Sequence, residues 1–153
     1  MALSHETLKE DLFARYHREQ EDWKQSRSYR LILEHVGVPL ARPSGFRLLI
    51  KIYGIEAKME ARKSSLILPD SSKERDLWNS RLGLVLAMGP EAYEPSRFPY
   101  GPYCDVGDYI YFTRHDSSLC RINGHNMAIL NDDKCLTPVL DPKDFVNELQ
   151  IGV

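Results

Sequence analysis

Short apolar runs separated by turn-forming residues constrain the fold of this chain more than any other feature. From Phe46 onward they recur at roughly ten-residue spacing with few helical patterns between them, which is typical of a small all-β domain. The clearest pair, residues 119–122 and 127–130, flanks Asn123-Gly124, the dipeptide that most strongly favours a two-residue hairpin. The pattern therefore predicts a mainly β protein built as a small antiparallel β-barrel or sandwich.

The remaining strands are expected where the other apolar runs lie. These runs cover residues 46–52, 82–88, 109–113 and 135–136. Because of their position in these short apolar runs, we expect the core to include Leu48, Ile50, Val85, Leu86, Ile110, Phe112, Ile129 and Leu130.

The N-terminal part of the chain has a helical pattern instead. Residues 4–27 predict a helix with Ser4 as its N-cap, and residues 28–36 fit either a second short helix or a strand. Pro39, Pro43 and Gly45 then break the chain. We expect a helical N-terminal arm over residues 1–44, a barrel over 45–140 and a C-terminal tail over 141–153.

Leu8, Leu12 and Tyr16 recur every four residues and give the first helix a narrow apolar stripe. A helix with one such face is marginal in water and needs a surface that buries the stripe. That surface is either the protein's own barrel or a neighbouring chain, and the linker favours the neighbour. Deleting residues 1–44 is then expected to leave a folded barrel that assembles less well.

Composition excludes several classes of protein. The chain has 42% hydrophobic and 27% charged residues and a net charge of −2, which fits a soluble globular protein and gives no nucleic-acid footprint. No apolar run has the length of a membrane span, and the N-terminus lacks the pattern of a signal peptide. Three widely spaced cysteines indicate reduced thiols in a cytosol.

Catalytic motifs are missing from the sequence. It contains no zinc-ligand spacing, no phosphate-binding loop and no nucleophile elbow. Cys120 beside His115 or His125 could act as a nucleophile and base, and His115, Asp116 and His125 could bind a metal, but a buried thiol and loop histidines are the favoured interpretation. We expect no enzymatic activity, no cofactor and no metal.

Phe98, Tyr100 and Tyr103 form an aromatic cluster in a proline-rich loop over residues 91–104. Such rings could stack on bases or sugars. Because the cluster is not set in a basic surround, packing of the loop on itself or on a neighbouring subunit is favoured.

Leu66-Ile67-Leu68-Pro69 is a short apolar segment set in polar sequence. It is too short and too polar in its flanks for a good core strand. Three aliphatic side chains on a flexible loop suit a groove on another protein. An edge strand of an ordinary hairpin is the alternative.

Between Arg47 and Leu140 the chain resembles the GroES-like co-chaperonins, in particular the divergent members carried by bacteriophages. Five elements in the family's order carry the resemblance: residues 47–51, 66–68, 83–90, 106–112 and 127–136. It implies a partly open β-barrel that forms a sevenfold ring and caps an ATP-bound chaperonin. It also implies that Leu66, Ile67 and Leu68 enter a groove of that chaperonin. In this chain Pro138 stands in the strand expected to pair with a neighbouring subunit and removes a backbone donor there.

Arms at both ends of a barrel are also typical of virion proteins, in which such arms bind neighbouring subunits. A capsid or tail component built on the same barrel is therefore the alternative function. The expected partners are an ATP-bound chaperonin or capsid and tail proteins, with no nucleic acid and no membrane. The expected location is the host cytoplasm or, under the alternative, the virion.

Overall fold

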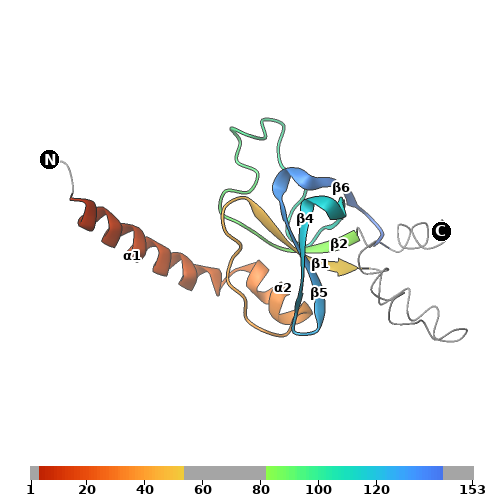
Figure 1. Ribbon diagram of the computed structural model, residues 1–153, viewed down its shortest axis with the longest axis horizontal. Helices are drawn as coiled ribbons and strands as arrows, with labels where there is room; N and C mark the ends of the chain where they lie inside the picture. The colour runs from red at the N-terminus through yellow and green to blue at the C-terminus, as the bar shows by residue number, and fades with distance from the viewer. Residues whose placement is uncertain (1–3, 54–81, 143–153) are drawn as a thin grey trace, which may run out of the picture.

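The structure is a computed structural model that describes residues 4–53 and 82–142. In this part of the chain two helices precede six strands, and two short 3-10 helices lie between strands. Figure 1 shows α1 projecting from the sheet while α2 lies against it. The elements are α1 (His5–Trp23), α2 (Arg27–His35), β1 (Arg47–Tyr53), β2 (Leu82–Met88), β3 (Tyr109–Phe112), η1 (Arg114–Asp116), β4 (Ser117–Ile122), β5 (His125–Asn131), η2 (Asp132–Lys134) and β6 (Cys135–Val139).

The six strands form one antiparallel sheet in the order β4-β5-β1-β2-β3-β6. All of its pairings are antiparallel, and β1 pairs with both β2 and β5 at the centre. Within the described residues β4 and β6 are the edge strands of this sheet. The fold is thus the antiparallel β structure that the sequence predicts, combined with two N-terminal helices.

One face of the sheet encloses the main hydrophobic core. Seven of the eight predicted core residues are buried, and most of them belong to this cluster. Ile129 is the exception, because it lies on the opposite face of β5 from Leu130 and is only half-buried there. The cluster contains Leu48, Ile50, Ile52, Val85, Tyr93, Phe98, Cys104, Ile110, Phe112, Ala128, Leu130 and Cys135.

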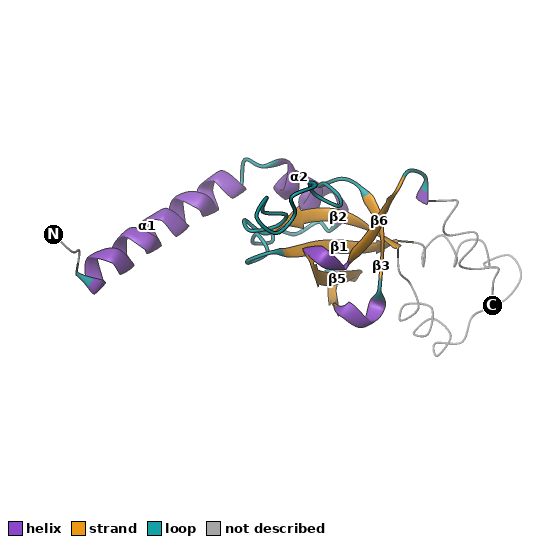
Figure 2. Ribbon diagram, turned by 90° about the horizontal axis from the view of Figure 1, so that it is seen from above, coloured by secondary structure: helices purple, strands orange, loops and turns teal. Residues whose placement is uncertain are grey.

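The other face of the sheet is covered by α2 (Figure 2). Ile32 and Val36 are buried against Leu49, Leu86 and Met127, which gives the molecule a second hydrophobic cluster. The ambiguous segment 28–36 is therefore a helix, and it shares a core with the sheet although it lies inside the expected arm over residues 1–44.

The C-terminus of α2 is held by two side chains from the sheet. Lys51 donates from Nζ to the carbonyl oxygen of His35 at 3.0 Å, and Asn123 donates from Nδ2 to that of Val36 at 2.6 Å. These bonds satisfy carbonyl groups that a helix leaves without intrahelical partners, and the ammonium group also favours the helix dipole. Asn123 has φ 50° and Gly124 has φ 78°, as the predicted two-residue hairpin requires.

Candidate functional site

The apolar tetrapeptide Leu66-Ile67-Leu68-Pro69 lies outside the described residues. The structure does describe the two strand ends from which this segment departs. Tyr53 at the end of β1 pairs with Leu82 at the start of β2. The segment therefore leaves and re-enters the sheet at one place.

A small cluster packs around these two strand ends. Leu82 and Val139 are buried, and Tyr53, Tyr109 and Tyr111 pack against them. The rings of Tyr53 and Tyr109 meet edge to face with their centroids 5.2 Å apart, a favourable aromatic geometry. Burial raises the pKa of Tyr109, which keeps its phenol neutral. The segment with the tetrapeptide thus departs from a base to which β1, β2, β3 and β6 all contribute.

A buried carboxylate holds the loop over residues 91–104. Asp132 is 0% exposed and accepts two hydrogen bonds from the Arg97 guanidinium, at 2.9 and 2.8 Å. It also accepts from the backbone N–H of Tyr93 at 2.9 Å, and the Tyr93 hydroxyl donates to the Asp132 carbonyl oxygen at 2.8 Å. The hydrogen bond with Asp132 raises the pKa of Arg97. A buried charge with this many partners fixes the loop on the sheet.

The aromatic rings of this loop pack on one another. Phe98 contacts Tyr93 and Tyr103 edge to face, with centroids 4.9 and 5.0 Å apart. The Arg97 guanidinium lies over the Phe98 ring at 5.0 Å. Tyr100, by contrast, is 102% exposed. The self-packed loop is confirmed for Phe98 and Tyr103, and Tyr100 stands apart from them.

The cysteines show no activated nucleophile. Cys120 is exposed, which corrects the expectation of a buried thiol, and partial desolvation raises its pKa. A hydrogen bond between the thiols of Cys104 and Cys135 raises the pKa of Cys104 and lowers that of Cys135, but both thiols are buried away from solvent. A nucleophilic thiol needs a lowered pKa and access to solvent.

Metal ligands are not assembled in the part of the chain that the structure covers. No group of three His, Cys, Asp or Glu side chains there could hold an ion, so His115, Asp116 and His125 do not form such a site. Asp116 instead faces Lys134 at 3.8 Å. No helix among the described residues is long and apolar enough to cross a membrane.

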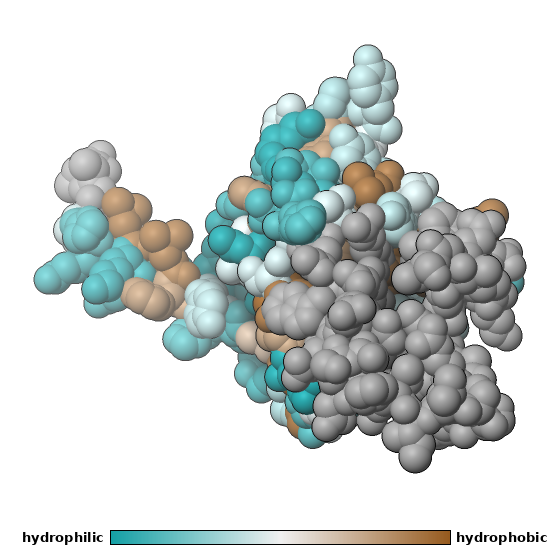
Figure 3. Space-filling model, turned by 45° about the vertical axis from the view of Figure 1, so that its right-hand side comes forward, coloured by the Kyte–Doolittle hydropathy of each residue, from teal (hydrophilic) through white to brown (hydrophobic). Residues whose placement is uncertain are grey.

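The predicted stripe on α1 is exposed along its length. Leu12 is 65% exposed, and Leu8, Phe13 and Tyr16 are exposed as well. Figure 3 shows brown, hydrophobic side chains gathered along this projecting helix.

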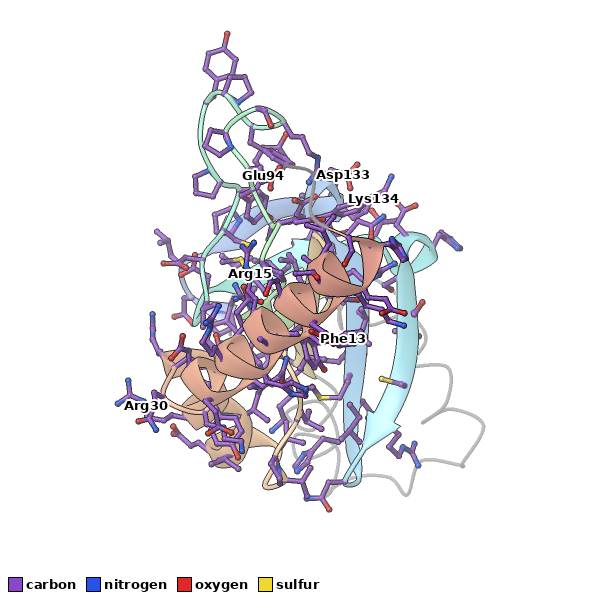
Figure 4. All side chains as sticks on the ribbon, turned by 90° about the vertical axis from the view of Figure 1, so that its left-hand side faces the viewer. Phe13, Arg15, Arg30, Glu94, Asp133 and Lys134 are labelled. Carbon is purple, nitrogen blue, oxygen red and sulfur yellow. The ribbon has the colours of Figure 1, made fainter. Side chains whose placement is uncertain are left out.

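The side of α1 that carries Leu12 and Tyr16 borders a groove. Its other wall is Pro90, Glu91 and Glu94, and it encloses about 390 Å³. Figure 4 shows Arg15 on α1 and Glu94 on the loop near this groove. Nothing in the sequence pairs residues 90–94 with the helix, so sequence reasoning missed this wall of the groove.

The comparison with known proteins decides the family. Residues 41–138 match the family Cpn10, described as "Chaperonin 10 Kd subunit", over more than half of the chain. The chain belongs to this family. The six-stranded sheet is therefore a GroES-like fold, and the resemblance inferred from the sequence is confirmed at the level of the Cpn10 family. Because this is a family of co-chaperonins, the expectation that the chain is not an enzyme is also confirmed.

Curated relatives of this Cpn10 chain carry the name co-chaperonin GroES. The protein of Syntrophomonas wolfei is 30% identical over 98 residues, which cover 64% of this chain and 96% of the relative. That of Methylacidiphilum infernorum is also 30% identical over 98 residues, covering 64% and 92%. That of Geobacillus stearothermophilus is 27% identical over 100 residues, covering 65% and 99%.

Proposed function

We propose that this protein is a co-chaperonin, of the type carried by bacteriophages, that forms a homo-oligomeric ring and caps an ATP-bound chaperonin in the host cytoplasm. The contact residues are Leu66, Ile67, Leu68 and Pro69. The observation that carries the proposal is the family match, because it runs through residues 41–138 and so includes this segment. The packed strand ends at Tyr53 and Leu82 support it, since they offer a firm base for a binding segment.

The energetics suit reversible capping by several copies together. Burial of three aliphatic side chains contributes about 1.5–3 kcal/mol each. Ordering a loop costs about 1–2 kcal/mol per residue, which offsets most of that gain. One segment would therefore bind weakly. A symmetric ring presents many segments at a high effective concentration, so they bind together and are released together.

This proposal assigns a different role to each segment of the chain. Residues 45–140 carry the capping role together with α2, which shares a core with their sheet, and α1 and the tail over residues 141–153 are additions to this unit. Within the arm, α2 serves the sheet that it covers. The exposed α1 is left for contacts with other chains.

A second candidate function is that of a structural protein of a virus particle, with capsid or tail proteins as partners. The exposed apolar stripe of α1 favours it, because projecting arms suit permanent assembly. Under this function Leu66, Ile67 and Leu68 pack against a particle neighbour and no chaperonin is bound.

The test is Ile67→Ser, with Leu33→Ser as the matched control. Leu33 is an exposed leucine on α2, so its replacement adds the same hydroxyl on a surface that the proposal does not use. We expect Ile67→Ser to abolish ATP-dependent binding to a chaperonin in sedimentation and electron microscopy, without a change in melting temperature. Leu33→Ser should bind as the wild type does.

Three results contradict the proposal. Wild-type protein that binds no chaperonin favours the virion function instead. Capping that survives Ile67→Ser removes the segment from the contact. Destabilisation by several kcal/mol places Ile67 in a core or a permanent interface.

A further inference from the structure

α1 projects from the sheet because the corner that joins it to α2 is fixed. Trp23, at the end of α1, is buried, and its Nε1–H donates to the Leu40 carbonyl oxygen at 2.8 Å. Ser26 donates from Oγ to the Trp23 carbonyl oxygen at 2.6 Å and also caps α2, since it accepts from the backbone N–H of Tyr29 at 3.2 Å. Figure 1 and Figure 2 show the helix running away from the sheet. The apolar stripe of α1 therefore needs a surface other than this chain's own sheet.

The stripe lies near the end of the sheet opposite to the one from which the apolar tetrapeptide departs. The tetrapeptide segment leaves and re-enters the sheet beside the pair Tyr53 and Leu82. At the other end of the same two strands Leu48 pairs with Met88, and the loop that begins at Pro90 and borders α1 follows directly. A contact made by α1 is therefore separate from the proposed capping contact.

The exposed face of α1 has the same spacing when it is read in either direction. Leu8, Leu12 and Tyr16 form its centre, His5 precedes them and Glu19 follows, and all five side chains are exposed. The intervals between these residues are three, four, four and three positions, so the face is symmetric about Leu12. A twofold contact brings the same surface of two copies together. If two such helices run antiparallel, Leu12 meets Leu12 on the twofold axis, and Leu8 of each copy meets Tyr16 of the other.

The charges of α1 favour the same arrangement. In the antiparallel pair His5 lies across from Glu19 of the second copy, so its imidazole can donate a hydrogen bond to that carboxylate. Arg15 pairs with Glu19 of its own helix at 3.1 Å. The reversal brings Arg15 within about 3 Å, along the helix axis, of Asp11 on the second copy, because a helix rises about 1.5 Å per residue. A parallel pair in register would instead place Glu19 against Glu19, a like-charge contact that disfavours it.

A groove beside the stripe gives the second helix room. It encloses about 390 Å³ between Leu12 and Tyr16 on α1 and the wall at residues 90–94. We propose that α1 is a self-pairing helix, which packs antiparallel on α1 of a second copy with Leu12 at the twofold axis and Leu8 of that copy beside the groove. This contact goes beyond the proposed function. It joins two copies, or two rings, back to back, with the strand ends that carry the tetrapeptides on the far sides.

Oxidative crosslinking of the full chain tests the pairing. The background carries Cys120→Ser, which leaves only buried thiols. Under copper–phenanthroline oxidation L12C alone should give a disulfide-linked dimer. A mixture of L8C chains and Y16C chains should give mixed dimers. L8C alone should give none, because the two Leu8 positions lie about 12 Å apart along the axis and a disulfide needs Cα atoms within about 7 Å.

Ala14 provides the matched control, since it is exposed on α1 but points away from the Leu12 side of the helix. A14C should give no dimer. Absence of the L12C dimer, in a variant whose melting curve matches that of the wild type, overturns the pairing. Dimers of L8C without mixed L8C–Y16C dimers overturn the antiparallel arrangement, and equal crosslinking by A14C shows random collision and overturns both.

Two replacements of His5 give a second test that needs no oxidation. His5→Glu should weaken the pair in sedimentation equilibrium, because it faces Glu19 of the second copy. His5→Lys should keep the pair, because it faces the same carboxylate with a positive charge. Their effects on α1 itself run the other way, since an acidic residue in the first turn favours the helix dipole and a basic one opposes it. Equal weakening by both replacements overturns the antiparallel contact.

Leu12→Glu separates the pairing from the proposed function. We expect it to halve the mass of the assembly and to leave ATP-dependent binding to a chaperonin unchanged. Loss of chaperonin binding in this variant would place α1 in the capping contact and overturn the inference. Wild-type protein that pairs through α1 but binds no chaperonin supports the inference and removes only the proposed function.

Discussion

The two N-terminal helices are neighbours in sequence and opposites in burial. In α2, Ile32 is 0% exposed and Val36 is buried beside it, both against the sheet. In α1, Leu12 stays exposed together with the rest of its stripe. Both helices begin with a serine cap, at Ser4 and Ser26, so the signals that start them are alike. The comparison shows that an apolar stripe predicts that a helix is buried against some surface. Whether that surface belongs to the same chain depends on where the chain places the helix.

The largest expected effect on stability is the difference between deleting residues 1–44 and deleting residues 1–22. Removing residues 1–44 takes Trp23, Ile32 and Val36 from the second hydrophobic cluster. At about 1.5–3 kcal/mol for each buried side chain, the loss approaches the whole stability of a typical domain, about 5–15 kcal/mol. We therefore expect this truncation to unfold or aggregate, as measured by circular dichroism and sizing. Because α2 is buried on the sheet, this expectation differs from the one drawn from the sequence, that the truncated barrel stays folded.

Removing only residues 1–22 is the control for that deletion. It spares Trp23 and all of α2, so the melting temperature should stay close to that of the full chain while the oligomer weakens. A stable, soluble chain beginning at residue 45 would abolish the distinction between the two helices.

A smaller effect is expected from single truncations on the two helices. Ile32→Ala should lower the free energy of unfolding by about 2–5 kcal/mol, because it leaves a cavity under α2. Leu12→Ala should change it by less than about 0.5 kcal/mol, since its side chain is exposed. Urea titrations at a protein concentration low enough to dissociate the oligomer measure both values. Equal costs at the two positions would show that α1 is packed within the monomer.

The smallest effect concerns the end of α2. Asn123→Gly keeps the positive φ that the turn needs but removes the donor to the Val36 carbonyl oxygen. Loss of one such hydrogen bond should cost about 0.5–1.5 kcal/mol in the free energy of unfolding. Asn123→Asp also keeps the turn residue but lacks the amide donor, so it should lose at least as much. Wild-type stability in the aspartate variant would show that the turn, and not the cap, accounts for the cost.

Local signals made much of this fold predictable. Asn123-Gly124 predicted the hairpin, and the short apolar runs predicted the strands and most of the core. Ser4 caps α1 as expected, accepting from the backbone N–H of Thr7 at 3.1 Å. The predicted helix over residues 4–27 ends earlier, at Trp23, because Ser26 caps the second helix.

Contacts between distant residues were beyond the sequence patterns. The turn containing Asp132 gave no sign that its carboxylate meets Arg97, because the two come together only when the loop over residues 91–104 folds onto the sheet. Residues 28–36 stayed ambiguous for the same reason, since it is the apolar surface of the sheet that α2 covers. The binding role of Leu66–Leu68 falls outside the described residues and stays a prediction.

The hydrogen bond from Asn123 that caps α2 can form only late in the synthesis of the chain. Asn123 lies 87 positions after Val36, whose carbonyl oxygen it binds. At about 5–20 residues per second, translation needs roughly 4–17 s to cover that stretch. Throughout this interval α2 has neither its cap nor the complete sheet beneath it, and its apolar side is exposed to solvent. During these first seconds of synthesis, the nascent chain of a protein from a co-chaperonin family is itself exposed to aggregation through the apolar side of α2.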